Sequence, residues 1–156
     1  MRRLAYVGIG SNCQAELTLP QAARELGLLL EEICGSGVFR SASRSSGPDY
    51  LNMVVSGYAD LTWRDLISAL KSIEDRIGRD RTDRVLCRID LDLLWYDGVQ
   101  VENVLPHSDI WRYGYTTVPL LDACRRGGTR VPEGEPDDET IARLSSGVKP
   151  FDLKVF

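Results

Sequence analysis

The segment Ile89–Trp95, with the sequence IDLDLLW, constrains the fold more than any other part of the chain. Successive side chains of a strand point to opposite faces, so the isoleucine and the leucines would share one face and Asp90 and Asp92 the other. The apolar face predicts a strand that packs on a core. The other face sets two carboxylates about 6.5–7 Å apart along the chain, close enough to share a hard cation such as Mg²⁺. A solvent-exposed polar face is the alternative interpretation of this pair.

Arginine is concentrated immediately before this strand, at Arg76, Arg79, Arg81, Arg84 and Arg88. A glycine and two aspartates interrupt the arginines without helical spacing, which predicts a flexible basic loop. Guanidinium groups bind phosphate oxygens, and carboxylates bind the metals that polyphosphates carry. Together the loop and the strand predict a magnesium–polyphosphate site. A solvated loop balanced by nearby acidic residues is the alternative.

Apolar periodicity and turn residues predict the remaining elements. Strands are expected at residues 4–10, 35–43, 51–59, 89–95 and, as a short piece, 99–101, and helices at 20–32, 62–77, 116–124 and 137–144. Thr62 and Asp65 resemble a capping box, Gly78 should end that helix, and Pro119 should lie in a first turn. The order β-α-β-β-α-β, followed by helices, predicts an α+β ferredoxin-like sandwich, a mostly antiparallel sheet flanked by helices. A length of 156 residues is expected to form a single domain, residues 1–156.

Composition narrows the classes of function. A net charge of −4 gives no general attraction to nucleic acid, and no apolar run reaches the ~20 residues of a membrane span. Four separated cysteines and a start that reads as a strand rather than a signal peptide predict a cytoplasmic protein with reduced thiols. Neither nucleic acid nor a membrane is therefore expected as a partner. The oligomeric state stays open, with a monomer favoured.

Common nucleotide-binding signatures are absent from the sequence. No GxxxxGK[ST] segment occurs, and in GIGSNC the residue Cys13 stands where a dinucleotide-binding motif has its third glycine. Phosphate binding is therefore expected to come from side chains and metal rather than from a glycine-rich cradle.

Six segments in order, between Leu4 and Leu121, resemble the 6-hydroxymethyl-7,8-dihydropterin pyrophosphokinase family of folate biosynthesis. YVGIGSN resembles the opening strand and GSN turn of that family, FRS its YRT, and PDYLNMVV its PDYLNAAV. IEDRIGRDR resembles a glutamate followed by GRxR, and IDLDLLWYDG is similar to LDLDLLLYG. LPHSDIWRYGYTTVPL resembles PHPR…RAFVLVPL. The resemblance implies a ferredoxin-like enzyme that transfers pyrophosphate from ATP to the pterin alcohol and releases AMP.

The resemblance also implies roles for individual residues. Two Mg²⁺ ions would be bound by Asp90 and Asp92, which would be catalytic together with Arg79, Arg81 and Arg88. ATP would be contacted by Glu74, His107 and Arg112, and the pterin by Ser41, Tyr50, Asn52 and Tyr115. Structural roles remain as alternatives: Asn52 as a strand-end polar residue, Tyr50 and Tyr115 as packing aromatics, His107 as a turn cap, and Glu74 as a partner of Arg76 or Lys71.

The chain departs from the family pattern in the catalytic loop. Where the family has RWGPRTLDLD, this chain has RVLCRIDLD, which is one residue shorter, has Val85 in place of tryptophan and lacks the glycine–proline pair. Tyr113 stands where the family has an arginine, and Arg112 lies one position early. The loop SASRSSG is also shorter than usual and lacks prolines. A divergent paralogue that acts on another pterin or alcohol, and a non-catalytic pterin- or nucleotide-binding protein, therefore remain alternatives.

Overall fold

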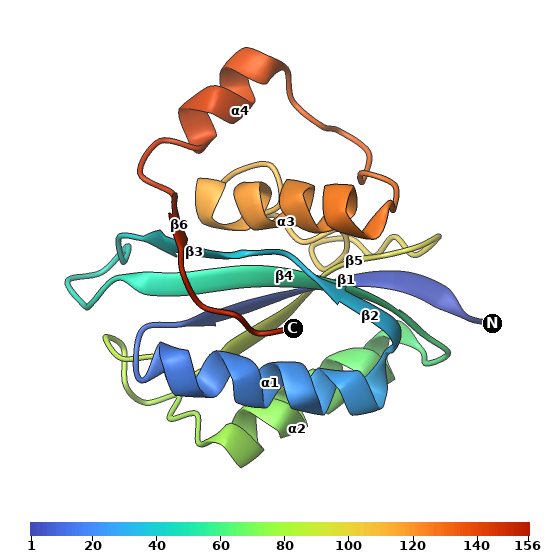
Figure 1. The fold of residues 1–156 in the computed structure, drawn as a ribbon. Coiled ribbons are helices and arrows are strands. Elements are labelled where there is room, and N and C mark those ends of the chain that lie inside the picture. The colour runs from blue at the N-terminus through green and yellow to red at the C-terminus, as the bar shows by residue number, and fades with distance from the viewer.

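The computed structural model describes residues 1–156 as a six-stranded sheet with two helices on each face (Figure 1). The strands are β1 (Arg3–Ser11), β2 (Glu31–Gly35), β3 (Val38–Ser41), β4 (Tyr50–Ala59), β5 (Asp90–Tyr96) and β6 (Lys149–Phe151). The helices are α1 (Ala15–Leu29), α2 (Trp63–Ile77), α3 (Gly114–Gly127) and α4 (Asp138–Leu144). None of these helices combines the length and the apolar composition that crossing a membrane would require.

The sheet has the order β5-β1-β4-β3-β6, with β2 also paired to β4, and every pairing is antiparallel. Helices α1 and α2 cover one face of the sheet, and α3, with α4 beyond it, covers the other (Figure 1). This arrangement confirms the predicted α+β ferredoxin-like sandwich with a mostly antiparallel sheet. It also places β1 and β5 side by side, so that the strand with the two aspartates lies next to the first strand of the chain.

The larger core fills the space between the sheet and helices α1 and α2, with Leu26 and Leu70 among its fully buried residues. A smaller core lies under α3, where Leu94 of β5 packs with Leu120. Strand alternation divides β5 as expected, because Leu91 and Leu93 belong to the larger core, whereas Asp90 and Asp92 face the α3 side with Leu94.

Helix α2 forms almost as predicted because its boundaries are set locally. The Thr62 hydroxyl accepts the Asp65 N–H at 3.1 Å, and Gly78 ends the helix with a φ of 100°. Asp137 caps α4 in the same way, accepting the Thr140 N–H at 2.8 Å.

Several predicted elements differ from the structure. The single strand expected at residues 35–43 is divided, because β2 ends at Gly35 and β3 spans only Val38–Ser41. Helix α1 spans Ala15–Leu29 rather than residues 20–32, and α3 spans Gly114–Gly127 rather than 116–124, so Pro20 and Pro119 each occupy the sixth helical position instead of the first turn. Residues expected at the end of α1 instead form β2, because they pair with β4. The predicted strand at 99–101 is only an isolated bridge between Val101 and Leu105. The C-terminal segment, for which no structure was predicted, supplies β6, paired with β3.

Candidate active site

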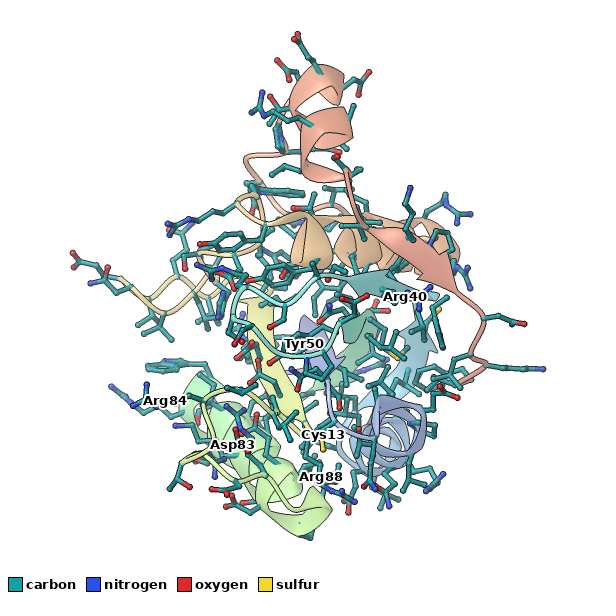
Figure 2. The ribbon with its side chains drawn as sticks, turned by 90° about the vertical axis from the view of Figure 1, so that its left-hand side faces the viewer. Cys13, Arg40, Tyr50, Asp83, Arg84 and Arg88 are labelled. Atoms are coloured by element: carbon teal, nitrogen blue, oxygen red, sulfur yellow. The ribbon has the colours of Figure 1, made fainter.

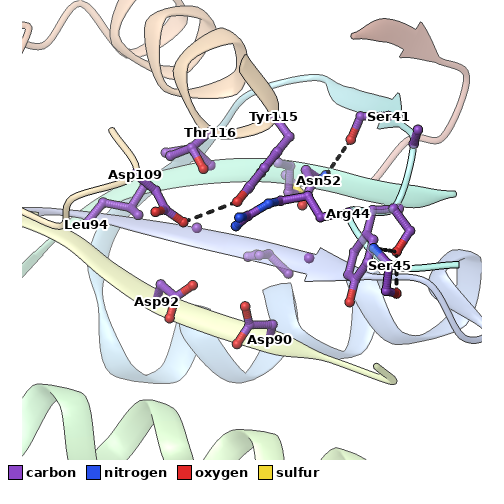
Figure 3. Close-up of a pocket in the computed structure, with 18 of the residues that line it drawn as sticks. Ser41, Arg44, Ser45, Asn52, Asp90, Asp92, Leu94, Asp109, Tyr115 and Thr116 are labelled. Atoms are coloured by element: carbon purple, nitrogen blue, oxygen red, sulfur yellow. Dashed lines mark hydrogen bonds between the residues drawn. The ribbon is translucent and has the colours of Figure 1, made fainter. Parts of the chain in front are cut away.

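A cavity of about 320 Å³ opens on the α3 side of the sheet, where β1, β4 and β5 meet the loop after β3. We call it the main cavity. Its lining includes Asp90, Asp92, Tyr50, Asn52 and Tyr115, which come from both the metal and the pterin groups of predicted residues. Figure 3 shows the two aspartates pointing into this cavity from one strand, across from Tyr115.

Glycines of β1 form the floor of the main cavity. A Cβ atom at Gly10 would lie 2.7 Å from the side-chain oxygen of Asn52, and one at Gly8 would touch Leu94 at 3.4 Å. A glycine inside a strand often marks a close approach of a ligand or another group. The sequence shows both glycines, but without the positions of Asn52 and Leu94 it does not show that they face a cavity.

A second space of about 360 Å³, which we call the α2 recess, lies between α2, β5 and the basic loop. Its lining includes Glu74, Arg79, Arg81 and His107. Asp90 and Asp92 line both the main cavity and the α2 recess. The two carboxylates therefore stand at the boundary between a space that contains Tyr50, Asn52 and Tyr115 and a space that contains Arg79, Arg81 and His107.

Glu74 organises the α2 recess. Its side chain is only 5% exposed, accepts the Leu91 N–H at 2.7 Å and forms ion pairs with Arg79 at 3.0 Å and Arg81 at 2.8 Å. Burial raises the pKa of Glu74, while the Leu91 N–H and the arginines oppose that rise. The alternative pairing of Glu74 with Arg76 does not occur, because Arg76 pairs with Glu25.

The two aspartates have different environments. Asp90 is 39% exposed at its side chain and forms an ion pair with Arg79 at 2.7 Å. Asp92 has no cationic partner, and burial together with the nearby Asp90 charge raises its pKa from 3.8 to about 8. A like-charged carboxylate disfavours the ionised form of its neighbour unless a cation is present. Without a bound cation, Asp92 therefore keeps its proton up to about pH 8, and a cation at this strand face would displace that proton.

This donor set fits magnesium bound together with phosphate. No group of three His, Cys, Asp or Glu side chains could hold a metal ion by itself. Mg²⁺ usually keeps several waters and takes one or two carboxylates plus substrate phosphates, rather than a cage built only of protein ligands. Asp90 and Asp92 supply those carboxylates, and the arginines beside them suit phosphate.

The basic loop between α2 and β5 is fixed to the sheet by Asn12, a residue to which sequence reasoning gave no role. Asn12 donates its backbone N–H to the Cys87 carbonyl at 2.9 Å, and its side-chain oxygen accepts the Cys87 N–H at 2.6 Å. Its amide nitrogen donates to the Val85 carbonyl at 2.8 Å. The GSN turn after β1 therefore holds the end of the loop that leads into the aspartate strand.

The predicted site residues are brought together only in part. Asn52 donates to the Ser41 hydroxyl at 3.4 Å, and both line the main cavity with Tyr50. His107 lines the α2 recess, and its Nδ1 also accepts the Asp109 N–H at 3.1 Å, the turn cap that was the alternative role.

Two predicted arginines lie outside both spaces. Arg88 donates to the Ile77 carbonyl at 2.8 Å and to the Gln14 side chain, so its guanidinium points to α1 and α2. Figure 2 shows it well below Tyr50. Arg112 is exposed and lies over the Tyr113 ring at 5.1 Å. In place of these two, Arg84 and Arg44 line the main cavity.

The fold and this site define a class: an α+β protein with a ferredoxin-like sheet that carries an acidic, arginine-flanked site suited to a phosphorylated ligand and a hard cation. Comparison with known sequences gives the particular family. A profile of the 7,8-dihydro-6-hydroxymethylpterin-pyrophosphokinase family matches residues 6–125, and the chain belongs to this family.

Three relatives illustrate the similarity. A 2-amino-4-hydroxy-6-hydroxymethyldihydropteridine pyrophosphokinase of Methylorubrum extorquens is 31% identical over 163 residues, covering 93% of this chain and 96% of the relative. A protein of that same name from Synechocystis is 32% identical, covering 76% of this chain and 65% of the relative. The mitochondrial folate synthesis bifunctional protein of Arabidopsis thaliana is 34% identical over 103 residues, or 64% of this chain, and the match spans only 17% of that longer protein.

Proposed function

We propose that this protein transfers the pyrophosphoryl group of ATP to the hydroxymethyl group of 6-hydroxymethyl-7,8-dihydropterin and releases AMP, a step of folate biosynthesis. Family membership and the names of the relatives from Methylorubrum and Synechocystis support this activity. The single observation that carries the proposal is the position of Asp90 and Asp92, which line both the main cavity and the α2 recess. A group transferred between ligands in these two spaces would pass these carboxylates.

In this proposal the pterin occupies the main cavity. Tyr50 and Tyr115 offer aromatic rings for stacking, and Ser41 and Asn52 offer hydrogen-bonding groups for the polar edge of the heterocycle. The hydroxymethyl oxygen would then face the aspartate strand. Neutral donors and acceptors suit this ligand, because the ring system needs orientation rather than charge compensation.

The nucleotide occupies the α2 recess in this proposal, with its phosphates against Arg79, Arg81 and His107. Arg79 and Arg81 are held by Glu74, so their guanidinium groups are positioned before ATP binds. Because Arg79 also pairs with Asp90, phosphate oxygens and Asp90 would compete for the same guanidinium. Such preorganised positive charge stabilises the charge that develops on the phosphoryl oxygens.

Asp90 and Asp92 are proposed to hold two Mg²⁺ ions together with the phosphates. When bound, magnesium would neutralise phosphate charge and align the attacking and leaving oxygens. The hydroxymethyl oxygen would attack the β-phosphorus in line, forming a C–O–P linkage while the bond between the β-phosphorus and the oxygen bridging to the α-phosphorus breaks, so that AMP leaves. Transfers of this kind depend mainly on positioning and electrostatics, so a dedicated general base is not required.

The experiment that tests this function measures AMP release from ATP and Mg²⁺, with and without 6-hydroxymethyl-7,8-dihydropterin. We expect AMP only when the pterin is present, and loss of turnover in Asp90→Asn. Asp152→Asn is the matched control, because Asp152 is an exposed aspartate beyond β6 that lines neither space.

Other outcomes would replace the proposal with a specific alternative. AMP formed only with another alcohol would identify a divergent paralogue. Binding of ATP and pterin without any AMP would identify a non-catalytic binding protein. These outcomes must be distinguished because the catalytic loop departs from the family pattern: it is one residue shorter and has Val85 in place of the tryptophan.

A further inference from the structure

Arg44, on the loop between β3 and β4, lines the main cavity although no family motif includes it. Its guanidinium lies 4.2 Å from the centre of the Tyr113 ring. Figure 3 shows the same guanidinium beside the Tyr115 hydroxyl, inside the cavity and on the side that faces the aspartate strand. Arg44, an exposed residue of the loop after β3, therefore extends its side chain into the cavity that Asp90 and Asp92 also line.

Two tyrosines support Arg44 in this position. Tyr113 and Tyr115 stack with ring centroids 5.2 Å apart and an interplanar angle of 12°. A guanidinium over an aromatic face is attracted by the ring quadrupole, and the flat group is more weakly hydrated than an ammonium. Tyr115 in turn donates to Asp109 at 3.3 Å, which fixes the end of the stack. The arginine is therefore held without using its charge on a carboxylate.

The charge of Arg44 is available for a ligand. Arg79 and Arg81 are neutralised by Glu74, Asp90 and Asp75, whereas no carboxylate forms an ion pair with Arg44. Of the two strand carboxyl groups, Asp90 pairs with Arg79, whereas Asp92 has no cationic partner. An unpaired guanidinium that lines the same cavity as a carboxyl group without a cationic partner is the arrangement expected when an anion and a metal cation bind there together.

We propose that Arg44 binds the pyrophosphoryl group during its transfer. The assignment rests on the proposed function and extends it to a residue outside the family motifs. It also accounts for Tyr113: this position, where the family has an arginine, here carries the aromatic ring on which Arg44 lies. The guanidinium thus reaches the site from another loop.

The alternative ligand for Arg44 is the pterin itself. The pterin ring carries no phosphate and, in the proposed function, contacts the neutral side chains of Ser41, Tyr50, Asn52 and Tyr115, whereas the guanidinium carries a charge that suits an anion. The planar guanidinium of Arg44 can donate two parallel hydrogen bonds to two phosphate oxygens, which makes the pyrophosphoryl group the better partner. The test must therefore measure the two ligands separately.

The experiment measures calorimetric affinities for two probes, the Mg²⁺ complex of α,β-methylene-ATP and unphosphorylated 6-hydroxymethylpterin. Because Arg44→Ala removes a charge-assisted hydrogen bond, it should weaken binding of the nucleotide analogue by about tenfold or more. Pterin affinity should change less than about threefold, well below the tenfold that 1.4 kcal/mol represents. Arg44→Lys should recover only part of the loss, because lysine keeps the positive charge but lacks the planar pair of N–H donors of a guanidinium. The double variant Arg44→Ala/Tyr113→Arg should recover most of it.

Arg40→Ala is the matched control. Arg40 lies on β3, is exposed and also lies over an aromatic ring, at 5.4 Å from the centre of Phe151, but it points away from the main cavity. Figure 2 shows it beside β6, on the far side of Tyr50 from Arg84. Both affinities should stay at the wild-type value in this variant.

Unchanged binding of the analogue by Arg44→Ala would overturn the proposal, and so would a loss confined to the pterin. These outcomes are separable from failure of the proposed function. If the wild-type protein released no AMP with the pterin, the analogue affinities would still decide whether Arg44 binds the phosphates.

Discussion

Replacing Asp92 with asparagine should make the metal-free protein more stable at alkaline pH while removing its activity. In the absence of a cation, burial and the Asp90 charge raise the pKa of Asp92 to about 8, from 3.8. Each pKa unit corresponds to about 1.4 kcal/mol, so ionising this group in the folded state costs at most about 6 kcal/mol. Effective dielectric constants in proteins exceed those of a dry interior, and we expect on the order of 2–4 kcal/mol.

The sign follows from the order of the two pKa values. Below about pH 4, the carboxyl group is protonated in both the folded and the unfolded chain, so it contributes no difference. As the pH rises from about 4 to 8, the unfolded chain loses this proton and the folded protein retains it, so stability falls. Above about pH 8 the loss is complete. The amide that Asp92→Asn introduces cannot ionise, and the variant should not show this part of the decline.

Urea unfolding in EDTA between pH 5 and 9 measures the effect, with Asp152→Asn as the control for loss of an exposed carboxylate. The free energy of unfolding of Asp92→Asn minus that of the wild type should grow with pH and level off above about pH 8. Parallel curves for the two proteins would refute the reasoning, because they would show that Asp92 is not held protonated. The same pKa predicts that Mg²⁺ affinity rises with pH up to about 8, since binding releases a proton.

Three further variants test the supports of the site. Glu74→Ala should reduce the free energy of unfolding by about 1–3 kcal/mol in urea titrations, because it leaves the buried Leu91 N–H without an acceptor and removes one carboxylate partner each from Arg79 and Arg81; breaking the exposed pair with Arg76→Ala should cost less than about 1 kcal/mol, and equal losses would contradict this view of Glu74. Asn12→Ala should lower stability by about 1–3 kcal/mol, because it leaves groups of the basic loop without partners, and should increase hydrogen exchange at the Cys87 amide; unchanged exchange would show that Asn12 does not anchor the loop. Val85→Trp should tighten pterin binding in calorimetry by up to about tenfold, since an aromatic pair adds about 0.5–1.5 kcal/mol beyond buried area, and no change would mean that the shortened loop does not reach the pterin.

Much of the fold follows from local sequence patterns. Alternation in IDLDLLW assigned Asp90 and Asp92 to the face opposite Leu91 and Leu93, as the structure confirms. Thr62 and Gly78 fixed the ends of α2, because a hydroxyl acceptor and a residue that tolerates positive φ act within one turn of the backbone. These features depend only on residues that are close together in the chain, so the sequence alone is enough to predict them.

Boundaries that depend on distant partners could not be predicted in this way. Pro20 was expected to begin a helix, yet α1 starts at Ala15, and the residues after Leu30 leave the helical pattern to pair with β4. The direction of the Arg88 side chain could not be predicted from its neighbours either, because the Ile77 carbonyl and the Gln14 side chain accept hydrogen bonds from its guanidinium. Hydrogen bonds across the fold outweighed the local preference in both places.

The sequence by itself determined the chemistry of the site: two carboxylates on one strand face, a run of arginines before them, and the polar and aromatic residues of PDYLN. Only the tertiary structure decided which arginines line the two spaces. Arg79 and Arg81 are held by buried Glu74, Arg88 points away, and Arg44 reaches the cavity from another loop by lying on Tyr113. A long flexible side chain has many rotamers, and the one that it adopts depends on partners that the fold, rather than the neighbouring sequence, places beside it.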